Sequence, residues 1–407
     1  MKILWIVNII LPEVSKDLDL PKNSLGGWLI GLSSQLIIDP DIELHIATVD
    51  SKIEYSKKIN NIHYHILDNS TKAWKNLKEK INPDVVHIHG TEFDFGMSYM
   101  YANGSENVIF SIQGLLSVYE RYYNYGITYY EIIKNITIRD ILKRDNLFQA
   151  KRKFKKRGYI EKLYFKKSKY VFGRTDWDKA HAYNLNSNIK YYHSGEVLRN
   201  SFYNSRKWDY SNCEPYTIFL SQAGYPIKGL HQVIKAASIL KKKFPKIKIK
   251  VAGKNIIDDS SFRNRISFNG YASYIKKLLV KNDLESNIEF LGFLSEEKIL
   301  EQYLKANVFV CPSSIENSPN SLAEAQILGV PNISSFVGGV QCMVKHGVDG
   351  FLYRFEEIEM LAYYIDDIFS NDKIKNFYHE GILERHNPEK IKNELVSVYK
   401  KIILNKI

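Results

Sequence analysis

Residues 308–331 read VFVCPSSIENSPNSLAEAQILGVP. The first four residues form a short, continuous apolar run, which is typical of a parallel strand buried on both faces. A polar loop follows this run, and the pattern of Ser321–Leu328 predicts a helix. In open α/β sheets, ligands bind at the carboxyl ends of strands, on such loops and at helix starts. The stretch therefore predicts an α/β sheet with a ligand site after this strand.

The same alternation of apolar runs and helical patterns continues along most of the 407 residues. It indicates two doubly wound α/β units, and the polar stretch 200–215 reads as the linker between them. The predicted strands are Ile3–Val7, Glu43–Thr48, Val85–Ile88, Val108–Ile112, Tyr170–Phe172, Tyr216–Leu220, Ile247–Ala252, Ile288–Phe290, Val308–Cys311 and Asn332–Ser334. The predicted helices include Gly27–Ile38, His231–Phe244, Tyr271–Asn282, Ser295–Leu304, Ser321–Leu328 and Ile358–Phe369, and a last one near 388–404 with an apolar face.

The composition is that of a globular protein with a strong positive charge. The formal net charge is +12, which favours an anionic partner, or else reflects a lysine-rich bias with ordinary solvated faces. The three cysteines are far apart, so we expect neither a disulfide framework nor a structural zinc site. No apolar run is long enough to span a bilayer, and Ile3–Leu11 reads as a buried strand rather than a signal peptide. We expect a cytoplasmic protein, or one peripheral on the inner face of the cytoplasmic membrane.

One segment, 139–169, carries most of the positive charge, with 13 Lys or Arg against three acidic residues. Its pattern predicts one or two basic amphipathic helices broken near Gly158, and six tyrosines lie just before it in 119–130. Basic residues beside aromatic ones suit an anionic membrane surface. A helix that packs its apolar side on the N-terminal domain is the alternative, and both stay open. No nucleic-acid-binding motif is present, so we expect no nucleic-acid partner.

Two carboxylates flank the start of the helix in the opening stretch. Glu316 lies in the loop after the strand and Glu324 lies one turn inside the helix. Carboxylates in this position accept hydrogen bonds from sugar hydroxyls. The amides of the first helical residues, Asn320, Ser321 and Leu322, are able to bind an anion. The alternative is a helix start with no ligand, and the pattern alone does not decide between them.

A lysine follows another strand of the same half. The loop Ser221-Gln-Ala-Gly-Tyr-Pro-Ile-Lys-Gly229 places Lys228 beside a glycine after the strand ending at Leu220. A point charge there would stabilise a departing phosphate, whereas an exposed loop lysine is the alternative. Lys254, after the next strand, is a second candidate cation.

The N-terminal half has weaker signals at its strand ends. Gly26 and Gly27 open a helix and let a backbone approach a phosphate or sugar, although such a pair is more often only a turn. No Gly-x-Gly-x-x-Gly is present, which argues against an enzyme that uses NAD or FAD. Arg174 follows a strand and is a candidate for binding a phosphate or an anionic acceptor group.

Three further polar residues lie near the strand ends of this half. We expect His87 and His89 to face different sides, with one of them packed inside, and the pair makes a poor metal site. Gln113 follows the next strand, where it is able to donate and accept hydrogen bonds but not to act as a general acid or base.

The run from Cys311 to Pro331 resembles the signature of family 4 retaining glycosyltransferases, which have the GT-B fold. The family shows Glu, seven residues, Glu, then Ala and Gly-x-Pro, which here are Glu316, Glu324, Ala325 and 329–331. The resemblance implies that Glu316 lies by the donor sugar, that Glu324 binds the nucleotide ribose and that Lys228 holds the donor diphosphate. Three departures are visible: the family's Gly-Phe-Gly is replaced by 317–320, its arginine by Gln222 and Ala223, and its histidine near the donor sugar by Gln113.

The resemblance implies two Rossmann-like doubly wound parallel-sheet domains facing across a cleft. The N-terminal domain, 1–200, would bind the acceptor and be joined by the C-terminal helix 388–407, and the C-terminal domain, 201–387, would bind a nucleotide-sugar donor. It also implies a hexosyltransferase that needs no cofactor or metal and acts on a glycan or lipid-linked glycan in cell-surface polysaccharide synthesis. The alternatives are a nucleotide-sugar epimerase, a polysaccharide phosphorylase, or a catalytically silent sugar-nucleotide-binding membrane scaffold.

Overall fold

The computed structural model describes the chain except residues 22–25, 262, 263, 265, 372–376, 379 and 405–407. It divides into two compact units, each built around its own sheet. Unit 1 comprises Met1–Ser117, Lys156–Arg199 and Glu384–Ile407, and unit 2 comprises Val118–Lys155 and Asn200–Leu383. Residues 118–155, which the sequence predicts to belong to the first domain, therefore group with unit 2. The chain changes units again between Arg199 and Asn200.

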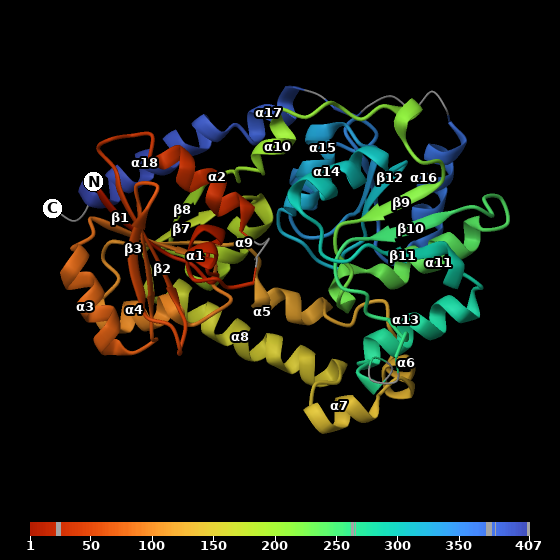
Figure 1. The fold of residues 1–407 in the computed structure, drawn as a ribbon, viewed down its shortest axis with the longest axis horizontal. Coiled ribbons are helices and arrows are strands. Elements are labelled where there is room, and N and C mark those ends of the chain that lie inside the picture. The colour runs from red at the N-terminus through yellow and green to blue at the C-terminus, as the bar shows by residue number, and fades with distance from the viewer. Residues whose placement is uncertain (22–25, 262–263, 265, 372–376, 379, 405–407) are drawn as a thin grey trace. The chain divides into compact units, whose positions relative to one another are not determined.

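Unit 1 is built around a sheet that includes the strands labelled β1, β2, β3, β7 and β8 in Figure 1. Its eight strands lie in the order β3-β4-β2-β1-β5-β6-β7-β8. Every pair is parallel except β3 with β4, so β3 is an antiparallel edge strand. The central strands β1, β5 and β6 are buried almost along their whole length, as the continuous apolar runs predicted. The strands are β1 Lys2–Ile6, β2 Glu43–Val49, β3 Tyr55–Ile59, β4 Ile62–Leu67, β5 Val85–His89, β6 Val108–Ser111, β7 Tyr170–Gly173 and β8 Lys190–His193.

Helices cover this sheet, and the last one belongs to it although it comes from the end of the chain. Helix α18 buries Ile391, Leu395, Val398, Tyr399 and Ile402, so the apolar face predicted there is confirmed. It packs against α2 and β5. The other helices with residues in unit 1 are α1 Pro12–Asp17, α2 Gly27–Leu36, α3 Thr71–Ile81, α4 Phe95–Asn103, α5 Leu116–Tyr119, α8 Leu147–Lys167, α9 Asp176–Leu185 and α17 Glu380–Arg385, with α18 at Pro388–Leu404.

Unit 2 contains a six-stranded sheet, all parallel, in the order β11-β10-β9-β12-β13-β14. Renumbered along the chain this order is 3-2-1-4-5-6, the order of a Rossmann fold, which reverses direction between β9 and β12. The strands are β9 Thr217–Leu220, β10 Lys248–Val251, β11 Ile288–Phe290, β12 Val308–Cys311, β13 Asn332–Ser335 and β14 Phe351–Tyr353. Its helices include α6 Tyr129–Lys134, α7 Ile138–Lys143, α10 Asn200–Tyr203, α11 Leu230–Leu240, α13 Gly270–Lys281, α14 Glu296–Lys305, α15 Asn320–Leu328 and α16 Ile358–Ser370.

The basic segment forms two helices, α7 and α8, but their boundary is not at Gly158. α8 runs unbroken from Leu147 to Lys167, and the chain turns instead at Arg144, whose φ is 50°. Gly158 lies inside α8. A larger residue would not fit at this position, because a Cβ there would come within 2.6 Å of the Ser117 backbone. The prediction of a break at Gly158 is therefore wrong, since this glycine serves a close approach. Among the described residues, no helix has both the length and the apolar character needed to cross a membrane.

Candidate functional site

The strongest candidate site lies where the sheet of unit 2 reverses its strand order. Ligands of such sheets bind in the crevice outside the carboxyl ends of the two strands at this point, here β9 and β12. Lys228 lies in the short 3-10 helix Pro226–Lys228 after β9, and Glu316 lies in the loop after β12. The Lys228 Nζ atom is 2.6 Å from Glu316 Oε1. The structure thus brings together two residues that the sequence pointed to separately.

The two loops are fixed to each other by their backbones. The Ser314 amide donates a hydrogen bond to the Ile227 carbonyl over 2.8 Å. Between them stands Gly229, whose φ is 69° and at which a Cβ would lie only 1.8 Å from the carbonyl oxygen of Pro312. Only glycine has both this backbone conformation and this contact. The sequence Lys228-Gly229 therefore places the lysine against the loop that carries Glu316.

Glu316 is held in place by neighbours of its own loop. The Ser313 hydroxyl donates to Glu316 Oε1 over 2.8 Å, and the Gly339 amide donates to the Glu316 carbonyl over 3.0 Å. Ser313 was not among the predicted site residues, although it too follows β12 directly. These contacts orient the carboxylate toward Lys228. A carboxylate held in this way is suited to positioning a polar ligand.

The charge state of Lys228 follows from its surroundings. Burial disfavours the ammonium, but the adjacent Glu316 carboxylate outweighs this effect, so the pKa of Lys228 lies above its usual value. The side chain keeps 19% of its surface exposed. An ammonium has three N–H donors, and Glu316 occupies one of them. The protonated lysine therefore remains able to donate to an anionic ligand in the crevice.

Helix α15 supplies the rest of this site. Leu322 donates its amide to the Pro319 carbonyl over 3.0 Å, so of the three predicted anion-binding amides this one is used within the first turn. The amides of Asn320 and Ser321 precede it and have no helical carbonyl to bond. Glu324 is buried, and its Oε2 lies 3.3 Å from the hydroxyl of Tyr303. Lys254 is exposed in the loop after β10, the strand on the other side of β9.

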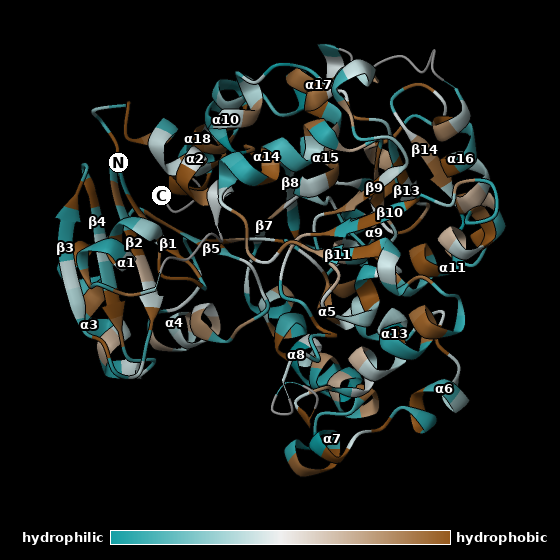
Figure 2. Cartoon of the chain, turned by 45° about the vertical axis from the view of Figure 1, so that its right-hand side comes forward, coloured by the Kyte–Doolittle hydropathy of each residue, from teal (hydrophilic) through white to brown (hydrophobic). Residues whose placement is uncertain are grey.

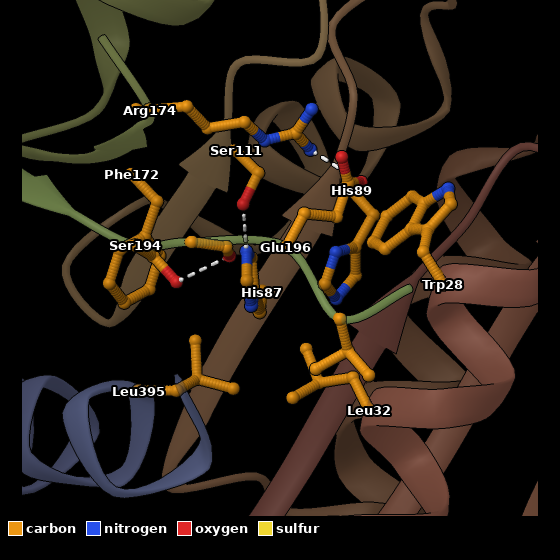
Figure 3. Close-up of a pocket in the computed structure, with 13 residues that line it drawn as sticks. Trp28, Leu32, His87, His89, Ser111, Phe172, Arg174, Ser194, Glu196 and Leu395 are labelled. Carbon is orange, nitrogen blue, oxygen red and sulfur yellow. Dashed lines mark hydrogen bonds and ion pairs between the residues drawn. The ribbon is translucent and has the colours of Figure 1, made fainter. Parts of the chain in front are cut away.

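Unit 1 has a separate small pocket at the carboxyl ends of its strands, shown in Figure 3. Arg174, directly after β7, forms an ion pair with Glu196 over 2.8 Å, and both side chains are largely buried. The pair has no net charge, so Arg174 does not present the unpaired positive charge that the sequence suggested for an anionic group. Two polar side chains, His89 and Ser111, line the same pocket beside Trp28.

The two histidines of β5 both lie on this side of the sheet. His87 and His89 are buried and their ring centroids are 3.8 Å apart. The prediction that they face different sides is wrong, because side chains two residues apart on a strand point to the same face. Burial lowers the pKa of His87 to about 3 and holds that of His89 well below its usual range, so both rings are neutral.

Both ring nitrogens of His87 have hydrogen-bond partners within unit 1. The Trp5 indole donates to the Tyr399 hydroxyl over 3.1 Å, and that hydroxyl lies 2.6 Å from His87 Nδ1. His87 Nε2 lies 2.6 Å from Ser111 Oγ. Ser111 also lines the pocket.

His89 completes the polar lining of this pocket. In the part of the chain that the structure describes, neither ring nitrogen of His89 has a hydrogen-bond partner, although the residue is only 3% exposed. A neutral imidazole has one donor and one acceptor, and leaving both unmade in a buried position is costly. The pocket therefore suits a group that both donates and accepts, such as a hydroxyl.

The remaining predicted residues of unit 1 lie around this pocket rather than in it. Gly26, with φ 85°, precedes α2, and Gly27 is the first residue of α2, the helix that brings Trp28 and Leu32 to the pocket. A Cβ on Gly27 would lie 2.9 Å from the Arg199 side chain. Gln113 is half-buried two residues beyond β6, near Gly90.

Comparison with known proteins agrees with this arrangement. Residues 204–382 match the family model described as Glycosyl transferases group 1. A UDP-Gal:alpha-D-GlcNAc-diphosphoundecaprenol alpha-1,3-galactosyltransferase from Escherichia coli is 29% identical over 156 residues, 37% of each chain. The capsular polysaccharide biosynthesis glycosyltransferase CapM from Staphylococcus aureus is 26% identical over 180 residues, 42% of each chain. The matched region thus spans less than half the length of these curated relatives.

The fold is shown over the whole chain. The sucrose-phosphate synthase from Thermosynechococcus elongatus superimposes with a TM-score of 0.74 at 16% identity, covering 100% of both chains. Together with the two Rossmann-like sheets, this shows that the chain has the GT-B fold, as predicted.

Proposed function

We propose that the protein is a retaining glycosyltransferase that moves a hexose from a nucleotide-sugar donor to a glycan or lipid-linked glycan acceptor in cell-surface polysaccharide synthesis. The observation that carries this proposal is the Lys228–Glu316 pair at the point where the sheet of unit 2 reverses its strand order, within the segment that matches the family model.

The donor would bind at this pair through its diphosphate. Lys228 and the amides of Asn320 and Ser321 are the donors available to phosphate oxygens, and Glu316 is placed to accept hydrogen bonds from the sugar hydroxyls. Glu324 would take the ribose hydroxyls, in keeping with the family resemblance. Charge develops on the diphosphate as it leaves, so a fixed ammonium and helix amides stabilise the transition state more than the bound donor.

The proposed step is a same-face displacement. The bond between the anomeric carbon and the diphosphate oxygen breaks, and the acceptor oxygen bonds to the same face of that carbon. The acceptor proton passes to the departing diphosphate oxygen, so no protein base and no metal ion is required. The products are the elongated acceptor, with its anomeric configuration retained, and a nucleoside diphosphate.

The acceptor would reach unit 1. The pocket around His89 and Ser111 suits one neutral hydroxyl group, and the Arg174–Glu196 pair adds no net charge. The Escherichia coli relative is named for a UDP-sugar donor and a diphosphoundecaprenol-linked acceptor. UDP-sugars and lipid-linked sugars are accordingly the first donors and acceptors to test.

A patch on α6 and α7 supports a membrane-facing acceptor. Here large apolar side chains are exposed between lysines and arginines, and Figure 2 shows brown, apolar stretches on both helices. The exposed apolar residues are Tyr129, Tyr130, Ile133, Ile138, Ile141 and Leu142. Apolar side chains ringed by basic ones suit the headgroup region of an anionic bilayer. We include peripheral binding at a cytoplasmic membrane face in the proposal.

A donor-cleavage assay tests the proposed function. The full chain is incubated with UDP-glucose, UDP-galactose, UDP-N-acetylglucosamine and GDP-mannose, and release of nucleoside diphosphate is measured with and without a lipid-linked acceptor. Release that increases with acceptor, and an α-configured product by proton NMR from an α-donor, would support the proposal. A free epimerised sugar would indicate an epimerase, phosphate-dependent formation of a sugar phosphate would indicate a phosphorylase, and nucleotide binding without cleavage would indicate a silent scaffold.

A further inference from the structure

A second cluster of polar side chains lies in unit 1, at the amino-terminal ends of β2 and β4. The pocket described above lies instead at the carboxyl ends of the strands. Glu43 and His45 are two residues apart on β2 and share one face of the sheet. His63 of β4 is the register partner of His45, and the two rings stack with centroids 4.5 Å apart. Because imidazole lone pairs lie in the ring plane, the half-buried His63 ring would have to turn about its side-chain bonds to share one ion with His45. One ligand atom from each of Glu43, His45 and His63 lies within 4.8 Å of the other two.

Both ring nitrogens of His45 have hydrogen-bond partners. Its Nε2 lies 2.9 Å from Glu43 Oε1, and its Nδ1 lies 3.0 Å from Nε2 of His65. His65 follows His63 by two residues on β4 and shares its face of the sheet. Nδ1 of His65 lies 3.1 Å from the hydroxyl of Ser56 on β3. Each link of this chain is able to exchange its donor and acceptor roles.

In this arrangement His45 is able to act as a metal ligand, with His65 and Ser56 as the hydrogen-bond partners that hold its ring. If Nε2 of His45 gives its lone pair to a cation, Nδ1 must carry the proton and donate it to His65. His65 then takes its own proton on Nδ1 and donates it to Ser56. Histidines that bind metals almost always donate their second N–H, usually to a carboxylate, a backbone carbonyl or water, which fixes the tautomer and the ring orientation. Here the imidazole of His65 would be the acceptor.

The cluster is reachable from solvent on one side. His45 is buried and His63 is half-buried, whereas 44% of the Glu43 side chain is exposed. A cation would therefore reach the cluster past Glu43, whose carboxylate supplies a negative charge next to the two imidazoles.

We propose that Glu43, His45 and His63 bind a divalent transition-metal ion of the zinc class, with His65 as the residue that orients His45. Two imidazoles and a carboxylate are a ligand set that zinc, cobalt and nickel accept, and a water would complete a four-coordinate site. The ion would tie β2 to β4 close to the edge strand β3. Because the site is at the amino-terminal edge of the sheet, it is independent of the proposed transfer reaction.

The surrounding charge sets the expected strength. Lys2, Lys58 and Lys80 act on these groups electrostatically and oppose a divalent cation. Exposed lysines are screened by salt, so their effect decreases with ionic strength. We therefore expect binding that tightens as salt concentration is raised, the opposite of what a cluster of acidic residues would show.

The test is titration of the purified full chain with ZnCl₂ alone by calorimetry, together with the visible absorption of bound Co²⁺. We expect one Zn²⁺ per chain and the spectrum of four-coordinate Co²⁺. His63→Ala and Glu43→Gln should each weaken Zn²⁺ binding at least tenfold and abolish this spectrum. His346→Ala, which removes an exposed histidine of unit 2, is the matched control and should bind as the wild type does.

A further variant separates this site from unspecific binding by surface histidines. His65→Phe keeps the three ligands but removes the partner of His45 Nδ1, and it should weaken binding tenfold to a hundredfold. Circular dichroism and the thermal midpoint without metal show that each variant is folded, and in the wild type Zn²⁺ should raise that midpoint. No Zn²⁺ binding by the wild type, or equal binding by folded His63→Ala and the wild type, would overturn the proposal.

Discussion

At the scale of single residues, the described part of each unit contains a largely buried ion pair at the carboxyl ends of its strands. Lys228–Glu316 joins loops after β9 and β12, and Arg174–Glu196 joins segments after β7 and β8. Sequence reasoning found Lys228, Glu316 and Arg174 because each follows an apolar run. It did not find how they pair, because the partners are up to 88 residues apart and meet only through the order of the strands.

The Arg174–Glu196 pair should matter for stability more than an exposed pair. Glu196→Gln leaves the guanidinium buried without its counter-charge, so we expect a loss of about 3 kcal/mol in the free energy of unfolding. The control is Glu301→Gln, since Glu301 and Lys305 are both about half exposed, and a pair of this kind contributes less than about 1 kcal/mol. Chemical denaturation of both variants measures the difference. Equal losses would mean that Arg174 is compensated by other groups.

At the scale of elements, most of the strands that were predicted have nearly continuous apolar runs. The ones that were missed, β3, β4, β8 and β14, have polar or aromatic residues in place of such a run. β3 reads YSKKI and is a mostly exposed edge strand, and β4 reads IHYHIL, whose histidines interrupt the apolar pattern. A strand that is buried on both faces is thus predictable from its apolar sequence. An edge strand such as β3 forms because it pairs with a neighbouring strand, and the sequence does not identify that neighbour.

The loop that presents Lys228 should be sensitive to one glycine and tolerant at another. Gly229→Ala would force a Cβ to within 1.8 Å of the Pro312 carbonyl at a φ of 69°, so we expect loss of stability and of donor cleavage together. Gly224, in the same loop, has no neighbouring atom within 4 Å of an added Cβ. Gly224→Ala should keep both the thermal midpoint and the activity. An active, stable Gly229→Ala variant would show that this contact does not position the lysine.

The patch on α6 and α7 makes a prediction about membrane binding. We expect the protein to bind vesicles that contain phosphatidylglycerol, and to bind less at high salt, because the attraction is partly electrostatic. Replacing Ile141 and Leu142 together by serine removes two exposed apolar side chains without touching the core, and should weaken binding. Vesicle sedimentation measures this. Absent binding, or binding that depends on neither lipid charge nor salt, would contradict a membrane role for the patch on α6 and α7.

At the scale of the whole molecule, the GT-B fold was predictable because two series of strands and helices repeat the same pattern. The grouping of 118–155 with unit 2 was not, since that segment precedes the linker and only tertiary packing assigns it. The Thr137 hydroxyl, for example, donates to the carbonyl of Phe268 over 2.9 Å. The two residues are 131 positions apart in the sequence, so no local sequence pattern predicts their contact.

The proposed mechanism uses no metal, and this can be tested on the complete protein. Transfer should continue in the presence of EDTA, because Lys228 and helix amides carry the charge of the leaving group. EDTA would also empty the proposed zinc-class site of unit 1, and the expected effect there is a lower thermal midpoint with unchanged turnover. Loss of turnover that added Mg²⁺ or Mn²⁺ restores would contradict the metal-free step.

The rate of donor cleavage by Lys228→Ala tests most directly whether Lys228 stabilises the departing diphosphate. Removal of one donor to a transition-state anion typically costs a hundredfold or more, so we expect a fall in turnover of about 100-fold. The matched control is Lys246→Ala. Lys246 is exposed and lies just before the amino-terminal end of β10, away from the carboxyl ends of the strands. This variant should cleave the donor at the wild-type rate. A folded Lys228→Ala variant that cleaves the donor as fast as the wild type would show that Lys228 does not stabilise the departing diphosphate.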